Sequence, residues 1–73
     1  MKKYNKEVGK ICREARKANG KSVTAFATIY CECSKETIYK FEHGQIDSAS
    51  LLVQYFRFFS DEDFKRLKEL EKK

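Results

Sequence analysis

The sequence predicts an all-α fold, a compact bundle of four to five short helices. Two observations support this prediction. Apolar residues recur at intervals of three and four along most of the chain, and no stretch alternates apolar and polar residues as a strand does. The chain has no proline and only three glycines, so its helices are expected to end at caps and turns. Seventy-three residues suffice for one small core, and residues 1–73 are expected to form a single domain.

The first two helices are delimited by turn and cap residues. The first is expected from about Asn5 to Ala18, followed by the pair Asn19-Gly20, which tolerates the positive φ that ends many helices. Ser22 supplies the side-chain oxygen that caps the second helix. The sequence Cys-Glu-Cys at residues 31–33 is expected to form a short break after it.

The later helices carry similar signals. Ser34 is expected to cap the third helix and Gly44 to end it. Asp47 or Ser48 caps the fourth. The sequence S-D-E-D at residues 60–63 is a capping-box pattern with an acidic first turn, and it starts a C-terminal helix at about residues 61–72.

Residues 22–30 and 34–43 form the most informative pair of helices. Two short helices joined by a tight turn, the second with polar residues facing outward, make a helix-turn-helix unit. The sequence therefore predicts such a unit at about residues 22–43. In DNA-binding proteins the second helix of this unit lies in the major groove.

A family resemblance points the same way. The segments VGKICREARKANGKSVTAFATIY and SKETIYKFEHG together resemble the Xre/Cro-type helix-turn-helix family of bacterial and phage repressors, over roughly residues 8–59. The positions that carry the resemblance are Arg16, Gly20, Ser22, Ala27 and the step Phe41-Glu42-His43-Gly44.

The chain also departs from the family pattern. Its turn between the second and third helices is one residue longer, with Cys31 near the place where the family often has glycine. Val23 replaces a frequent glutamine, which removes a usual DNA contact, and the proline that often precedes the fourth helix is missing.

The resemblance implies a lambda-repressor-like bundle and a function. The chain would be a sequence-specific DNA-binding transcriptional regulator, a repressor of phage or mobile-element type, with double-stranded DNA as its partner. The resemblance also implies that Arg16 and Glu42 form a structural ion pair between the first and third helices, which would fix the orientation of the third.

The third helix carries the candidate base-reading side chains. Ile38 and Phe41 are expected to point inward, which leaves a polar face outward. Lysine can donate to guanine, glutamate can accept from cytosine, and threonine can touch the thymine methyl group. The alternative is an ordinary solvated surface. The candidates on or beside this face are Lys35, Glu36, Thr37, Tyr39 and Lys40.

The positive charge of the chain lies mostly at its start. The net charge is +5, and residues 1–21 hold eight Lys/Arg and two Glu. Basic side chains that neutralise phosphates supply most nonspecific DNA affinity, although basic residues also serve solubility alone. Helix starts add partial positive charge near Ser22, Thr24 and Ser34. The other expected phosphate contacts are Lys10, Arg13, Lys17, Lys21 and Gln45.

The remaining residue types exclude several functions. Cys12, Cys31, Cys33 and His43 could bind zinc, but their spacing is unlike that of a zinc knuckle, and we expect neither metal nor cofactor. Three free thiols suggest a reducing cytoplasm. With one histidine and no glycine-rich loop, the chain is not expected to be an enzyme. No stretch is long and apolar enough to suggest a membrane partner.

The C-terminal helix predicts an assembly. Phe64, Leu67 and Leu70 share one face, and repressors of this type read two half-sites as dimers. We therefore predict a homodimer whose interface uses the fourth and fifth helices. The alternative is that the last helix folds back and covers Phe56 and Phe59 of its own chain.

A second function class stays open. The chain could be a protein-interaction module with the same fold, a modulator of a partner repressor or an antitoxin, whose partner is a second regulatory protein. The nearly neutral third helix and Val23 favour this alternative.

Overall fold

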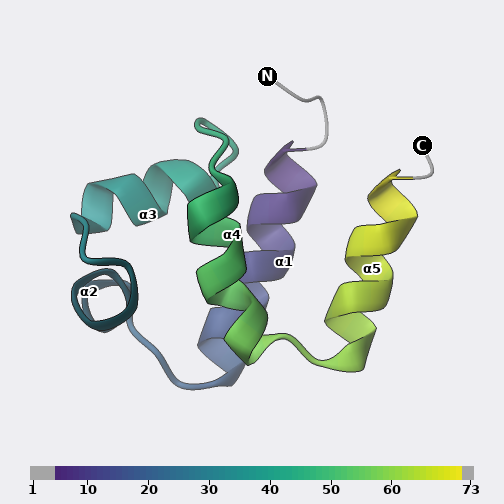
Figure 1. Cartoon of the computed structure of the whole chain (residues 1–73), viewed down its shortest axis with the longest axis horizontal. Helices are drawn as coiled ribbons and strands as arrows, with labels where there is room; N and C mark the ends of the chain where they lie inside the picture. Colours follow the sequence, from purple (N-terminus) through teal and green to yellow (C-terminus); the bar gives the residue numbers. More distant parts are fainter. Residues whose placement is uncertain (1–4, 72–73) are drawn as a thin grey trace.

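The capping residues of the sequence set where the helices begin. The computed structural model describes residues 5–71, and in this part of the chain every regular element is helical, which confirms the predicted all-α fold (Figure 1). The elements are α1 (Asn5–Ala18), α2 (Val23–Ala25), the π-helix η1 (Phe26–Cys31), α3 (Lys35–Glu42), α4 (Ala49–Tyr55), the 3₁₀-helix η2 (Phe56–Phe58) and α5 (Asp61–Glu71). The predicted extension of the last helix to residue 72 lies outside the described residues.

Four serines cap four helices. The hydroxyl oxygens of Ser22, Ser34 and Ser48 accept hydrogen bonds from the backbone N–H groups three residues later. Ser48 rather than Asp47 therefore caps α4. At α5 the cap is reciprocal, because the Asp63 N–H donates to Ser60 Oγ at 3.2 Å while the Ser60 N–H donates to Asp63 Oδ2 at 3.0 Å. This is the predicted capping box.

The second helix differs from its expected form. α2 continues directly into the π-turn of η1, in which each N–H reaches five residues back instead of four. The π-helix ends at Cys31, and the residue after it, Glu32, has a left-handed backbone with φ of 52°. The N–H groups of Glu32 and Cys33 both donate to the Ala27 carbonyl oxygen. The connection from α2 to α3 therefore consists of a wide helical turn followed by one left-handed residue.

Aromatic rings fill the centre of the core. Phe26 and Tyr55 are fully buried, and their ring centroids lie 4.5 Å apart. The Phe41 ring stacks on Tyr55, with the two ring centroids 5.5 Å apart. The three rings thereby join η1, α3 and α4 in one core. In Figure 1, α4 lies in front of α1, with α2 and α3 on one side and α5 on the other.

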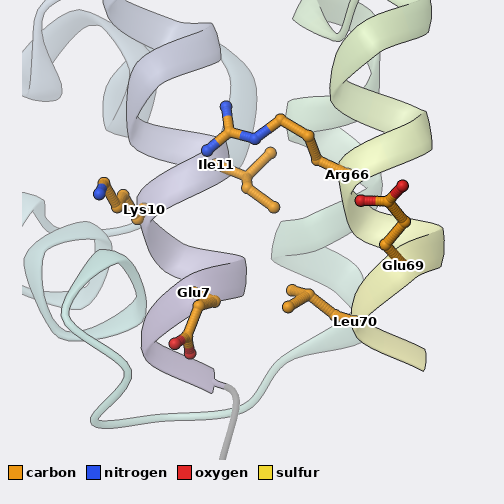
Figure 2. Close-up of a pocket in the computed structure, with 6 residues that line it drawn as sticks. All are labelled: Glu7, Lys10, Ile11, Arg66, Glu69 and Leu70. Atoms are coloured by element: carbon orange, nitrogen blue, oxygen red, sulfur yellow. The ribbon is translucent and has the colours of Figure 1, made fainter. Parts of the chain in front are cut away.

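α5 folds back along α1. Leu70 is buried, at 8% exposure, and Arg66 forms an exposed ion pair with Glu14 at 2.9 Å. Figure 2 shows Ile11 and Leu70 extending toward each other from the two helices, with the Arg66 side chain reaching across toward α1. A groove of about 210 Å³ remains between them, lined by Glu7, Lys10, Ile11, Arg66, Glu69 and Leu70.

This packing bears on the predicted dimer interface. Leu70 contributes to the packing within one chain, as in the alternative arrangement. Phe64 packs beside Phe56 and Phe59 at centroid distances of 5.3 and 5.0 Å but stays 37% exposed. Leu67 is half-buried. Of the three predicted interface residues, Phe64 and Leu67 thus keep surface that a partner could cover.

The helices between residues 5 and 71 include none with both the length and the apolar character that a bilayer crossing requires.

Candidate nucleic-acid interface

A buried hydrogen-bonded network lies beneath α3. Arg16 and Glu42 are only 4% and 5% exposed, and two parallel bonds join them. Arg16 Nε donates to Glu42 Oε2 at 2.8 Å, and Nη2 donates to Oε1 at 3.1 Å. The ion pair implied by the family resemblance is therefore present, with the paired geometry that guanidinium and carboxylate groups favour.

Tyr55 is a third member of this network, which the sequence did not indicate. Its hydroxyl donates to Glu42 Oε2 at 2.6 Å. Burial, together with the adjacent Glu42 carboxylate, raises the pKa of Tyr55 well above its usual range. The phenol therefore keeps its proton and remains a donor at any physiological pH. One carboxylate thus holds α3 to α1 and to α4.

The network also reaches the loop that precedes α2. Arg16 Nη1 donates to the Lys21 carbonyl oxygen at 2.7 Å. The hydrogen bond to Glu42 raises the pKa of Arg16 above its already high usual value, so the guanidinium stays charged. Arg16 therefore fixes the segment that leads into α2, as well as the end of α3.

Gly9 permits the close contact between α1 and α3. A Cβ atom at this position would lie 2.7 Å from the carbonyl carbon of Glu42 and 2.8 Å from the carbonyl oxygen of Phe41. Both atoms belong to backbone, which cannot turn aside as a side chain can. The sequence analysis missed this role, although a glycine inside a helical pattern is a known sign of close packing.

The outer surface of α3 is polar and accessible. Lys35, Glu36, Tyr39 and Lys40 are exposed. Glu36 and Lys40 occupy the side of the helix opposite the buried Ile38, whereas Lys35 and Tyr39 lie at the flanks of that polar side. Thr37 differs from the other candidates, because it is half-buried and its hydroxyl is hydrogen-bonded to Ser34 Oγ at 3.1 Å. Its methyl group could still touch a base, but its hydroxyl already has a partner.

His43 extends this surface by one turn. Its ring Nδ1 lies 2.7 Å from the Tyr39 carbonyl oxygen. Because a carbonyl oxygen only accepts, Nδ1 holds the proton of this bond. In the neutral ring Nε2 is then a free acceptor on an exposed side chain. His43 was not among the predicted DNA contacts.

The basic residues of α1 form one stripe. Its exposed members follow a spacing of four, three and four residues, which places them on one helix face. This α1 stripe consists of Lys6, Lys10, Arg13 and Lys17. The ion pairs found between residues 5 and 71 involve Arg16 and Arg66, so within this range no member of the stripe forms a close ion pair with a carboxylate. Lys6 was not among the predicted contacts.

The other predicted phosphate contacts are scattered around the helix starts. Lys21 is half-buried, whereas Thr24 and Gln45 are exposed. The Gln45 N–H donates to the Lys40 carbonyl oxygen at 2.8 Å, which leaves its side chain as the free group. Ser22 and Ser34 are exposed, and both hydroxyls are used as caps.

None of the protein-family models, curated proteins or solved structures with which the chain was compared matches it.

The four potential zinc ligands do not form a site. Between residues 5 and 71, no three His, Cys, Asp or Glu residues come together as a group that could hold a metal ion. Cys12 is fully buried in the core, and burial raises the pKa of its thiol to about 12. Cys31 and Cys33 are half-buried beside the turn that follows η1.

Proposed function

We propose that the chain is a sequence-specific DNA-binding transcriptional regulator in which residues 22–43 act as a helix-turn-helix. The observation that carries this proposal is the exposed polar face of α3, held in place from below by the Arg16–Glu42–Tyr55 network. A helix that reads base edges must be fixed against its scaffold, because misplacement by a fraction of an ångström breaks bidentate contacts. The free thiols fit a protein of the reducing cytoplasm.

Recognition and affinity would come from different helices. On α3, Lys35 and Lys40 supply donors, Glu36 supplies an acceptor, and Tyr39 offers an exposed ring and hydroxyl. These charges nearly cancel, so the face adds little nonspecific attraction. The α1 stripe supplies four exposed cations without a close ion pair among residues 5–71, which would release counterions from DNA phosphates on binding.

A test of this division uses fluorescence anisotropy with random and selected DNA duplexes at several salt concentrations. Lys35→Ala is expected to change the preferred sequence, because it removes a donor to base edges. Lys17→Ala is expected to weaken binding to all duplexes alike and to lower the salt slope by about one. Lys65→Ala, an exposed lysine on α5 outside both surfaces, is the matched control. If the Lys17 variant changed sequence preference instead, the reading helix would be misassigned.

A protein-interaction module is the second candidate function. It is favoured by the weak net charge of α3 and by two large apolar side chains on the surface, Ile29 at 67% and Val53 at 57% exposure. In that case the chain would bind a second regulatory protein, and the duplex experiments would show no salt-sensitive binding at all.

We further propose that two copies associate through the α4–α5 apolar patch. This patch consists of Val53, Phe56, Phe64 and Leu67. Val53 and Phe56 lie one turn apart, and the Phe56 and Phe64 rings are 5.3 Å apart, so the patch is continuous. Two copies would read half-sites one DNA turn apart, roughly 34 Å.

Phe64→Glu is expected to reduce dimerisation at least tenfold, because it puts a charge into the proposed interface. Sedimentation velocity, with and without bound DNA, measures the change. Lys65→Glu changes charge at the neighbouring exposed position and should leave the dimer intact. A wild-type protein that sediments as a monomer in both conditions would refute the dimer. The proposal that α3 reads DNA would not be affected by that result.

A further inference from the structure

The turn between η1 and α3 places two thiols side by side. Cys31 is the last residue of the π-helix, Cys33 follows the left-handed Glu32, and both are packed against the same hydrophobic core. Neither takes part in the Arg16–Glu42–Tyr55 network or in the exposed face of α3. They are therefore free for another role.

The backbone of Glu32 sets their separation. A left-handed residue is the mirror image of an α-helical one, so its two neighbours have Cα atoms about 5.4 Å apart by helix geometry. Disulfides join Cα atoms separated by roughly 4.4–6.8 Å. An extended residue at this position would put the neighbours near the upper limit of that range, whereas Glu32 puts them at its centre.

The two thiols also influence each other. Burial is the main cause that raises the pKa of Cys31 to about 11, and the neighbouring Cys33 thiol adds to the shift. The third cysteine is different, because Cys12 has no exposed surface and belongs to the centre of the core.

We propose that Cys31 and Cys33 are a redox-reactive dithiol that closes to an intramolecular disulfide across the turn before α3. The oxidant is a small disulfide of the glutathione type. In the first step Cys33 attacks as its thiolate and breaks the oxidant's S–S bond, which releases one thiol. Cys31 then attacks Cys33 Sγ and releases the second thiol. The two protein thiol protons end on the two released thiols, and two electrons pass to the oxidant.

The disulfide would act directly on the start of α3. An S–S bond of about 2.0 Å is far shorter than any nonbonded contact between sulfur atoms, so the turn must tighten. The π-helix that ends at Cys31 begins with the buried Phe26 and Ala27, whereas the segment after Cys33 starts with the exposed Ser34, so we expect the backbone shift to fall mainly on Cys33 and on Ser34, whose hydroxyl caps α3. We expect the oxidised protein to bind DNA at least fivefold more weakly. This consequence rests on the proposed function, whereas the disulfide itself does not.

The test treats the intact protein with excess oxidised glutathione, quenches it with acid, and counts free thiols after denaturation. Wild type is expected to fall from three free thiols to one, to lose the mass of two hydrogen atoms, and to stay free of bound glutathione. Cys12→Ala, the matched control, should fall from two thiols to none in the same way. Cys31→Ser should stop at a mixed disulfide on Cys33.

The possible results distinguish the disulfide, its effect on α3 and the proposed function. Retention of all three thiols, stable mixed disulfides in wild type, or a peptide map that links Cys12 would overturn the dithiol. If the disulfide forms but DNA affinity is the same in both redox states, the coupling to α3 is wrong. If the disulfide forms and neither redox state binds DNA, the proposed function fails while the dithiol stands.

Discussion

Glu42→Ala is expected to destabilise the protein by about 3–5 kcal/mol, the cost of removing one partner from a buried ion pair. The variant leaves the Arg16 guanidinium buried with only the Lys21 carbonyl as a partner, and it leaves the Tyr55 hydroxyl without its acceptor. In a domain of this size such a loss approaches the whole stability. Urea unfolding followed by circular dichroism measures it.

Two comparison variants distinguish the cost of breaking the buried ion pair from the cost of breaking an exposed one or of losing a single hydrogen bond. Glu14→Ala breaks the exposed ion pair with Arg66, in which the Glu14 side chain is 47% exposed, and should cost no more than about 1 kcal/mol. Tyr55→Phe removes one hydrogen bond to the same carboxylate and should cost about 1.5–3 kcal/mol. If Glu42→Ala unfolded at the same urea concentration as wild type, the network would not hold α3.

Gly9→Ala is the second change with a large expected effect. The new methyl group would overlap the backbone of α3 at Phe41 and Glu42, so the two helices must move apart. Overpacking of this kind costs typically 1–3 kcal/mol, and separating the helices also stretches the Arg16–Glu42 bonds, whereas the better helix propensity of alanine returns only about 1 kcal/mol. We expect a net loss of about 2 kcal/mol, or roughly 8–16 °C in Tm.

Gly20→Ala is the control for the Gly9 variant. A Cβ atom at Gly20 would meet no other atom within 4 Å, and only its positive φ of 69° opposes alanine. This change should cost about 1–2 kcal/mol through local strain alone, without moving α3. The two variants can be told apart by DNA binding, because only Gly9→Ala is expected to lower affinity beyond its effect on the folded fraction. Equal Tm values for Gly9→Ala and wild type would contradict the close contact.

Local signals in the sequence predicted the fold well. The bounds of α1 and the caps at Ser22, Ser34 and Ser60 depend on residues within one turn of one another, and the structure has them as predicted. The Arg16–Glu42 pair joins positions 26 residues apart, and it was accessible only through the family resemblance. The role of the α3 face in DNA binding stays a prediction.

What the sequence did not reveal depends on tertiary contacts. In the sequence, Tyr55 looks like an ordinary core aromatic residue, because no neighbouring residue indicates that its hydroxyl donates a hydrogen bond to Glu42. The same holds for Gly9, whose importance comes from the backbone of another helix. The short break near residues 31–33 is present, but the helix before it is a π-helix where a regular helix was predicted, since apolar spacing does not reveal a turn with one extra residue. The sequence did not decide whether Leu70 lies in a dimer interface or packs within its own chain, because an apolar helix face suits either arrangement.

The π-turn of η1 also indicates how a chain of this kind can change in length. A π-turn holds one residue more than an α-turn, so a helix can absorb an insertion there while the residues at its two ends stay in place. Phe26 and Ala27, at the start of η1, are buried in the core, whereas Ile29, in the middle of the π-helix, is exposed. Deletion of one residue here would restore a regular α-helix over the same core. Sequence length at this point can therefore vary over evolution without any rearrangement of the helices around it.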